Sequence, residues 1–283
     1  MILCVVGPTG VGKTKLSVEL AKHYNAVVLN GDSMQVYKEL NIGTAKVTEE
    51  EKEGIEHLLF DIVEPTDMYT VYDYQKDLRR VLEDNKDKNI VIVGGTGLYL
   101  KAALYNYVFT EEENNETYDD LTNEELYELV MKKDSNCDIH VNNRKRMIRF
   151  LNREENIKDK DKLLYDVKFI GLTTDREYLY ERINERVLVM FGEGLICEVK
   201  DLINKYGITN ILKRAIGYKE VIMYLNNEIT KEDCIELIQK NSRHYAKRQY
   251  TWFNNKMDIN WFDVDFNNFH NTYVEVLKYL EKQ

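Results

Sequence analysis

Cysteine and proline are scarce in this chain of 283 residues, which has 4 of the former and 2 of the latter. The cysteines lie far apart, without a C-x-x-C pair. A disulfide framework or a structural zinc site is therefore not expected, and small, reduced, buried thiols are. Disorder of the whole chain is excluded as well, because 11% of the residues are aromatic and 43% are hydrophobic, which is enough to build a packed core.

Long apolar runs are also missing. The longest, Ile2–Val6 and Ile90–Val93, are far shorter than the ~20 residues that cross a bilayer. The first residues, MILCVVGPTG, lack the basic and apolar regions of a secretory signal. We therefore expect a cytoplasmic protein without a membrane partner.

Positive charge is in deficit, with 39 basic against 49 acidic residues and a net charge of −10. Nine of the acids lie between Glu111 and Glu128, where there is no lysine or arginine. Two other segments, Asn142–Arg153 and Gln239–Met257, each carry five basic residues and no acid. The overall acidity therefore does not exclude an RNA partner. Acid facing RNA would repel it, so we expect the segment Glu111–Glu128 to point to solvent.

Strand and helix patterns alternate over the first hundred residues. Short apolar runs predict buried parallel strands, and the amphipathic segments between them predict helices. The expected strands are Ile2–Val6, Ala26–Asn30, His57–Val63 and Ile90–Val93, and the expected helices are Lys13–Tyr24, Asp73–Glu83 and Gly97–Leu104. This order predicts an α/β fold, a P-loop NTPase-like parallel sheet flanked by helices.

The alternation ends after residue 107. We predict a small helical insertion over residues 108–159, because Thr122-x-x-Glu125 is a capping-box signature and Asn142–Leu151 has a helical pattern. Residues 1–107 and 160–283 are assigned to the α/β core with a helical C-terminal region. Its expected elements are a strand at Val167–Leu172, helices at Arg176–Phe191, Glu193–Tyr206, Asn210–Leu225 and Lys231–Phe253, an edge strand at Asp258–Asp265 and a final helix.

A phosphate-binding motif follows the first predicted strand and opens a predicted helix. Its residues, which match G-x-x-x-x-G-K-[ST], are Gly7, Pro8, Thr9, Gly10, Val11, Gly12, Lys13 and Thr14. The backbone amides of such a loop bind an anion, Lys13 adds a positive charge, and the Thr14 hydroxyl is a ligand for Mg²⁺. The motif predicts a bound polyphosphate but does not say which one.

The chain lacks the usual acidic residue of an ATPase. The strand Ile90–Val93 runs into Gly94-Gly95-Thr96-Gly97 and has no terminal acid to organise Mg²⁺ and water. Asp32 instead follows the second strand, and the carboxyl end of that strand faces the phosphate loop in a sheet of this kind. There it can accept a proton from an acceptor substrate, as in small-molecule kinases. The alternative is an aspartate that only caps a turn or helix.

Several separated motifs occur in sequence along the chain. They are GPTGVGKT (Gly7–Thr14), DSMQVYK (Asp32–Lys38), IGTAK (Ile42–Lys46), HLLFDIVEP (His57–Pro65), VGGTGLYL (Val93–Leu100), RKRMIR (Arg144–Arg149), IGYKE (Ile216–Glu220) and NSRHYAKRQYTWF (Asn241–Phe253). In these motifs, and in their order, the chain resembles the tRNA dimethylallyltransferases, also called tRNA isopentenyltransferases. The resemblance implies transfer of a dimethylallyl group from dimethylallyl diphosphate to N6 of the adenosine 3′-adjacent to the anticodon in tRNA, with release of diphosphate.

The resemblance also implies roles for individual residues. Lys13, Thr14 and Arg182 would act on the diphosphate, with Mg²⁺ at Thr14 and with Arg186 nearby. The alternative for the two arginines is surface pairing with Glu181 or Glu185. Asp32 is the expected general base, because the adenine amine must lose a proton as the new bond forms. The residues expected to contact the tRNA anticodon loop are Asp32, Ser33, Met34, Gln35, Thr96, Lys145, Arg146, Arg149, Arg214, Lys219, Arg243, Lys247 and Arg248.

Two alternatives stay open at the level of sequence. A P-loop small-molecule kinase would transfer a phosphoryl group from ATP and would not need the basic helix near the C-terminus. A non-catalytic RNA-binding protein would not need Asp32. We expect a monomer and a structural His57. Helical spacing predicts one positive stripe, formed by Lys240, Arg243, Lys247 and Arg248.

Overall fold

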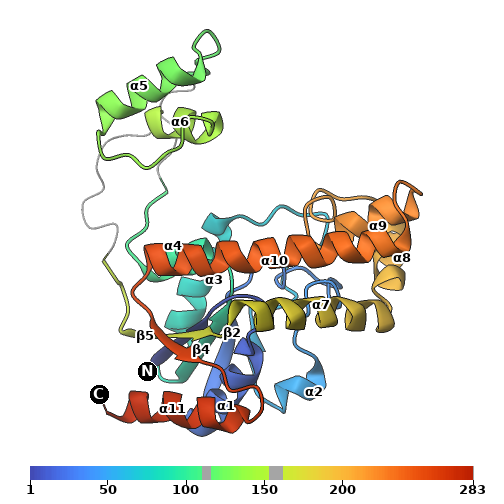
Figure 1. The fold of residues 1–283 in the computed structure, drawn as a ribbon. Helices are drawn as coiled ribbons and strands as arrows, with labels where there is room; N and C mark the ends of the chain where they lie inside the picture. Colours follow the sequence, from blue (N-terminus) through green and yellow to red (C-terminus); the bar gives the residue numbers. More distant parts are fainter. Residues whose placement is uncertain (110–115, 153–161, 283) are drawn as a thin grey trace. The chain divides into compact units, whose positions relative to one another are not determined.

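A parallel sheet organises the core of the protein. The structure, a computed structural model, describes residues 1–109, 116–152 and 162–282. Six strands lie in the order β3-β2-β4-β1-β5-β6, and neighbouring strands are parallel (Figure 1). Their bounds are β1 Ile2–Val6, β2 Ala26–Asn30, β3 His57–Leu58, β4 Asn89–Gly94, β5 Val167–Thr173 and β6 Asn260–Asp263. The predicted α/β class, a P-loop-like sheet flanked by helices, is confirmed.

Helices cover the sheet and continue beyond it. In the core they are α1 Lys13–Tyr24, α2 Glu49–Lys52, α3 Val71–Asp84, α4 Gly97–Leu104, α7 Arg176–Gly192, α8 Leu195–Tyr206, α9 Tyr218–Leu225, α10 Lys231–Lys256 and α11 Phe269–Glu281. The 26-residue α10 crosses the front of the core in Figure 1. No helix within the described ranges combines the length and the apolar character that a membrane crossing needs.

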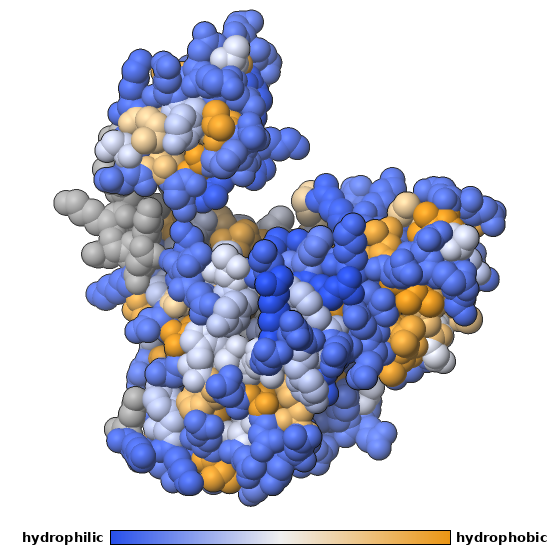
Figure 2. Space-filling model, in the orientation of Figure 1, coloured by the Kyte–Doolittle hydropathy of each residue, from blue (hydrophilic) through white to orange (hydrophobic). Residues whose placement is uncertain are grey.

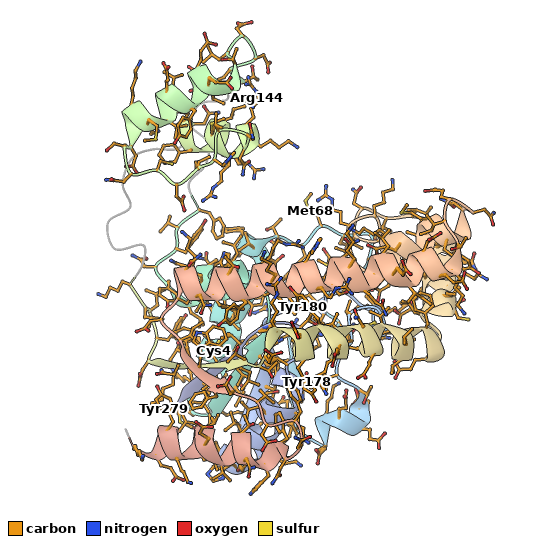
Figure 3. All side chains as sticks on the ribbon, in the orientation of Figure 1. Cys4, Met68, Arg144, Tyr178, Tyr180 and Tyr279 are labelled. Carbon is orange, nitrogen blue, oxygen red and sulfur yellow. The ribbon has the colours of Figure 1, made fainter. Side chains whose placement is uncertain are left out.

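The two faces of the sheet bury different helices, because successive side chains of a strand point to opposite faces. Leu3 and Val5 of β1 pack in one apolar cluster with residues of α1 and α11. Cys4 and Val6 pack in another with residues of α3, α4 and the end of α10. Cys4 is fully buried near the middle of the core (Figure 3). A third cluster joins residues 36–40 to α7, α8, α9 and α10.

Three predicted elements are markedly shorter than expected, and one of them is the edge strand predicted at Asp258–Asp265, which spans only Asn260–Asp263. The strand predicted over His57–Val63 pairs with β2 only at its first two residues, and Val63 forms a separate bridge with Tyr37. Leu59 and Asp61 between them have φ values of 66° and 53°, which an extended strand does not allow. The helix predicted over Asn210–Leu225 begins at Tyr218 instead. Gly217 precedes it with φ 93°, and residues 210–216 form turns and a bend.

The chain divides into two compact units, and the smaller one comprises residues 106–162. The insertion predicted at residues 108–159 falls inside it. Its helices are α5 Asn123–Lys133 and α6 Arg144–Leu151, which share a small core of Leu126, Val130, Ile139 and Met147. The predicted capping box is confirmed, since the Thr122 hydroxyl accepts from the Glu125 amide at 3.2 Å and the Glu125 carboxylate accepts from the Thr122 amide at 2.8 Å.

The acidic segment of the insertion behaves as predicted where it is described. The acids at positions 116, 119, 120, 124, 125 and 128 are all exposed. Residues 111–113, which carry the rest of the predicted acidic run, lie outside the described residues, and so does Arg153 of the basic segment. The described part of the acidic segment therefore points to solvent.

Candidate active site

The phosphate loop connects β1 to α1 and lines a cavity of about 810 Å³. Gly10 and Gly12 have φ values of 83° and 97°, which strain any residue with a side chain. A Cβ at Gly12 would also lie 2.9 Å from the Phe269 ring. Gly12 caps α1 without a side-chain hydrogen bond, so the first amides of this helix are available to an anion.

The loop residues separate into two groups. One group lines the cavity, where the motif predicts a bound polyphosphate: Thr9, Gly10, Gly12, Lys13 and Thr14. The others support the loop from behind: Val11 is fully buried, Gly7 lies against the Leu172 carbonyl, and Pro8 gives its carbonyl to Lys13.

Lys13 is partly buried, and its Nζ donates to the Pro8 carbonyl at 2.7 Å. Burial lowers the pKa of Lys13 to about 8, and the nearby Asp32 carboxylate opposes this shift. Loss of hydration thus disfavours the protonated, charged form of Lys13, whereas an anion bound in the cavity would favour it and raise the pKa again.

Asp32 lies just beyond the carboxyl end of β2 and lines the same cavity as Lys13. The side chain of Asn30 fixes its backbone, accepting from the Asp32 amide at 2.8 Å and donating to the Asp32 carbonyl at 3.0 Å. The Asp32 carboxylate accepts from the Met34 amide at 2.9 Å. Burial raises the pKa of Asp32, and this hydrogen bond and Lys13 oppose the rise. The carboxylate is therefore a stronger base than an exposed aspartate.

The predicted acceptor-side residues lie around Asp32. Ser33, Met34 and Gln35 line the cavity. Thr96 is linked to Ser33 by two hydrogen bonds, one from the Ser33 amide at 3.0 Å and one between the hydroxyls at 3.2 Å. The Gln35 amide nitrogen donates to the carbonyls of Thr44 and Ala45 at 3.1 and 3.3 Å. Its carboxamide is thereby held at the cavity wall.

Two arginines of α7 reach the phosphate loop. Arg182 donates from Nε to the Gly10 carbonyl at 3.4 Å, and its guanidinium lies 4.0 Å from the centre of the Phe266 ring. Arg186 donates to the Thr9 hydroxyl at 3.3 Å and to the Ala45 carbonyl at 3.4 Å. Burial lowers the pKa of Arg186. The sequence predicts Arg182, but not Arg186, as a catalytic residue. The two arginines are spaced by one helical turn, so this spacing already indicated that both lie on the same face of α7.

The predicted stripe on α10 is divided between two faces. Arg248 lines the cavity, together with Asn241, Ser242 and Tyr245. Arg243 instead bonds to the side chain of Asn184 on α7. Lys240 and Lys247 are exposed and lie outside the cavity lining. Helical geometry keeps Lys240, Arg243 and Lys247 within about 60° of one another around the helix, whereas Arg248 is rotated about 100° from Lys247. The predicted stripe therefore does not extend to Arg248.

The remaining predicted RNA-binding residues lie in two places. Arg214 and Lys219 line the cavity, from the turns before α9 and from its first turn. Lys145, Arg146 and Arg149 lie on α6 of the smaller unit and are exposed. Arg146 pairs with Asp138 at 3.4 Å. Arg144 of the same basic stretch is structural, since it donates to the Leu121 carbonyl at 2.8 Å and also to the Tyr118 carbonyl (Figure 3).

The cavity also has parts that sequence patterns did not reveal. An apolar wall is formed by residues of α7, α10 and the neighbouring loops, namely Val47, Phe60, Ile183, Val187, Met190, Ile216 and Ile238. These are ordinary core-type residues, and nothing in their spacing separates them from the rest of the core. Gln249 is buried beside Thr9 and Gly95. Among the described residues, no group of three or more His, Cys, Asp or Glu side chains is arranged to hold a metal.

Comparison with known proteins connects this site to one group. A family model described as IPP transferase matches residues 35–256. The tRNA dimethylallyltransferase of Bacillus mycoides strain KBAB4 is 43% identical over 304 aligned residues, covering 99% of this chain and 94% of the relative. That of Bacillus subtilis strain 168 is 44% identical over 284 residues, covering 93% of this chain and 90% of the relative.

Solved structures agree with the sequence matches. A tRNA isopentenylpyrophosphate transferase from Staphylococcus epidermidis is 38% identical, with a TM-score of 0.78, and the match covers 100% of this chain and 99% of that one. A eukaryotic dimethylallyltransferase acting on tRNA is 28% identical, with a TM-score of 0.80, over 98% of this chain and 77% of that one.

Proposed function

Since the chain belongs to the IPP transferase family, whose curated relatives are tRNA dimethylallyltransferases and thus transferases, we propose the reaction in detail. The chain transfers a dimethylallyl group from dimethylallyl diphosphate to N6 of the adenosine 3′-adjacent to the anticodon in tRNA, and diphosphate is released. One observation carries the proposal. The phosphate loop and Asp32 line the same cavity, beside an apolar wall.

The diphosphate lies on the phosphate loop in this proposal. The amides at the start of α1, the Lys13 ammonium and the guanidinium groups of Arg182 and Arg186 supply positive charge there. An allylic diphosphate ionises readily when the charge on its leaving group is neutralised, so these groups provide electrostatic catalysis. The apolar wall suits the dimethylallyl group, which has no hydrogen-bonding atoms.

Mg²⁺ is proposed as the cofactor, with the Thr14 hydroxyl as its ligand from this chain. Thr14 lines the cavity beside Lys13, and the described residues offer no cluster of acids that would form an all-protein cage. This fits Mg²⁺, which usually binds through one or two protein groups and completes its coordination with phosphate oxygens and water. When bound, the ion would neutralise charge on the leaving diphosphate.

Asp32 acts as the general base. The N6 amine of adenine is a poor nucleophile because its lone pair is delocalised into the ring, and it loses a proton as the C–N bond forms. Burial raises the pKa of Asp32, which improves its ability to accept that proton. General-base catalysis of this kind contributes about 10²–10⁴-fold.

The nucleic-acid substrate is tRNA, and we propose that the target adenine leaves its stack in the anticodon loop to enter the cavity. Ser33 and Gln35 line the cavity near Asp32, where they can contact a base edge. Arg248, Arg214 and Lys219 carry positive charge at the same cavity. Hydrophilic residues cover most of the visible face across which α10 runs (Figure 2). We further propose that the protein is a cytoplasmic monomer.

The family relationship favours prenyl transfer over the kinase alternative. The sheet agrees with this choice. β4 ends at Gly94, and the turn that follows contains Gly95 and Thr96 rather than an acid.

A labelling experiment tests the reaction. The protein is incubated with Mg²⁺, labelled dimethylallyl diphosphate and unmodified tRNA, and a parallel sample receives labelled ATP with the same tRNA. We expect label on the precipitated RNA in the first sample, located at N6 of the adenosine beside the anticodon, and no ATP consumption in the second. Unlabelled RNA together with ATP turnover would restore the kinase hypothesis.

A further inference from the structure

Gln249 connects the two sides of the cavity through a single carboxamide. It lies in α10 and is only 5% exposed. Its oxygen accepts from the Thr9 amide of the phosphate loop at 2.8 Å. Its nitrogen donates to the Gly95 carbonyl at 3.0 Å, in the turn between β4 and α4. The side chain therefore joins the loop assigned to the donor to the turn beside the assigned base.

Both ends of this bridge lie next to residues with proposed roles. On the donor side, the hydroxyl of Thr9 accepts from Arg186 at 3.3 Å. On the acceptor side, a Cβ built at Gly95 would lie 3.7 Å from an Asp32 carboxylate oxygen. A shift at either end of the carboxamide would thus change the separation between the diphosphate-binding groups and the base.

The Gln249 carboxamide also occupies the space that a side chain at position 95 would need. A Cβ at Gly95 would lie 2.1 Å from the Gln249 amide nitrogen, so the carboxamide would have to move to admit it. The turn is free of side chains at the point where Gln249 enters it. Any larger residue at position 95 would therefore displace the Gln249 carboxamide, with or without a substrate.

We propose that Gln249 is a positioning residue for the transfer reaction: its carboxamide sets the spacing between the phosphate loop and the Asp32 side of the cavity. The inference rests on the proposed function. Gln249 acts through Thr9 and Gly95 and does not touch the reacting atoms. Because misplacement of reacting groups by about 1 Å costs roughly 10²-fold in rate, loss of the bridge should lower kcat more than it raises either KM.

Two variants separate the hydrogen bonds from the volume of the side chain. Gln249→Met keeps most of the volume and removes the hydrogen bonds of the carboxamide, to Tyr245 as well as to Thr9 and Gly95. Gln249→Ala removes the side chain. We expect both to lower kcat by about 10- to 100-fold, with less than about threefold change in KM for tRNA. If Gln249→Met retains the wild-type kcat, only packing matters and the proposal fails.

Gln75→Ala is the matched control. Gln75 is 7% exposed, lies on α3 and donates to the Ala102 carbonyl at 2.7 Å, but it does not line the cavity. Its loss should lower the melting temperature to a similar extent and leave kcat unchanged. Equal effects of the Gln75 and Gln249 variants on kcat would reduce Gln249 to a structural role.

A double-mutant cycle tests the contact with Gly95. Gly95→Ala alone should lower kcat as Gln249→Ala does, because the new methyl displaces the carboxamide. In the Gln249→Ala background the same substitution should change kcat by less than about twofold, since the clashing atoms are gone. Fully multiplicative effects would show that Gly95 and Gln249 act independently, against the proposal.

Amide hydrogen exchange provides a test that does not depend on the reaction. Gln249→Ala should increase the exchange rate of the Thr9 amide by at least about tenfold, because that amide loses its acceptor. Unchanged exchange would refute the bridge. Faster exchange in a protein that does not prenylate tRNA would instead refute the proposed function and leave the bridge in place.

Discussion

At the scale of single residues, Asp32 and Lys13 face one cavity with opposite charges and opposite responses to burial. Burial disfavours the charged form of each, so it raises the pKa of the acid and lowers the pKa of the base. Their mutual attraction opposes both shifts. The two side chains therefore titrate closer to neutral pH than exposed residues would. The pH dependence of catalysis should reflect both pKa values.

Asp32→Asn tests the general base. The substitution keeps the shape of the side chain and an oxygen acceptor for the Met34 amide, but an amide cannot accept the proton. We expect kcat to fall at least about 100-fold, with tRNA affinity within about twofold of wild type, in single-turnover assays and filter binding. Asp84→Asn, at an exposed position of α3, serves as the control. A variant with wild-type turnover would exclude Asp32 as the base.

The pH profile tests Lys13. Activity requires deprotonated Asp32, so kcat/KM for the donor should rise with pH through the raised pKa of Asp32. It should fall again above pH 8, because the pKa of Lys13 is about 8 and the neutral amine no longer attracts diphosphate. Bound diphosphate stabilises the ammonium, so the alkaline limb of kcat should lie at higher pH than that of kcat/KM.

Lys13→Arg provides the comparison for this profile. A guanidinium stays charged throughout the accessible range, so the alkaline limb of kcat/KM should move upward or vanish even if the maximal rate is lower. An alkaline limb at the same pH in wild type and variant would mean that another group causes it.

At the scale of elements, α10 combines two tasks on different faces. Gln249 and Arg248 line the cavity, whereas Lys247 is exposed and lies outside the cavity lining. A helix this long presents both faces at once because its residues advance about 100° each. The same element can therefore brace the phosphate loop and offer positive charge to a polyanion.

Salt dependence tests the charge on α10. Replacing Lys247 and Arg248 together by alanine should weaken tRNA binding and reduce the slope of log K against log salt by up to about two, roughly one for each phosphate that the variant no longer neutralises. The matched control removes Lys278 and Lys282, at the end of α11. If the slope of the α10 variant equals that of wild type, those two residues do not contact tRNA phosphates.

Helix α8 fixes the loop that supports Gln35. The Glu198 carboxylate accepts from the amides of Asn41, Ile42 and Gly43 at 3.1, 2.8 and 3.1 Å. It also accepts from the Tyr218 hydroxyl at 2.7 Å. One side chain thus orders a loop whose next carbonyls hold Gln35.

Glu198→Ala should therefore destabilise the core. Hydrogen bonds to charged groups contribute about 1.5–3 kcal/mol, so we expect the free energy of unfolding to drop by about that amount in urea titrations. Glu236→Ala, at an exposed position of α10, should change it by less than about 0.5 kcal/mol. A Glu198 variant as stable as the control would show that the loop orders itself.

At the scale of the whole molecule, the cavity is built from segments between residue 9 and residue 249. A ligand in it can therefore contact the phosphate loop, the segment after β2 and helices α7 and α10 together. Mg²⁺ with inorganic diphosphate should therefore stabilise the folded protein and raise its melting temperature. At a diphosphate concentration of 100 times Kd, the free energy of unfolding should increase by about 2.7 kcal/mol. Lys13→Ala should abolish most of this rise in differential scanning fluorimetry. An unchanged rise in the variant would place diphosphate elsewhere.

Much of the fold followed from the sequence because the relevant patterns are local. β1, β2, α1 and α4 begin and end where the apolar runs and glycines predict. The phosphate loop was recognisable because eight adjacent residues contain the whole motif. The end of β3 and the start of α9 were misplaced because they depend on single backbone angles, at Leu59, Asp61 and Gly217, which the hydrophobic pattern does not record.

The sequence by itself thus determined the parallel sheet, the phosphate loop, the candidate base and the family, since each depends on neighbouring residues or on motifs in order. Only the tertiary structure decided which arginine bonds to Thr9, how the basic residues of α10 divide between two faces, and that Gln249 bridges Thr9 and Gly95 across 240 and 154 residues. Such contacts depend on how distant elements pack, and packing leaves no periodic trace in the chain.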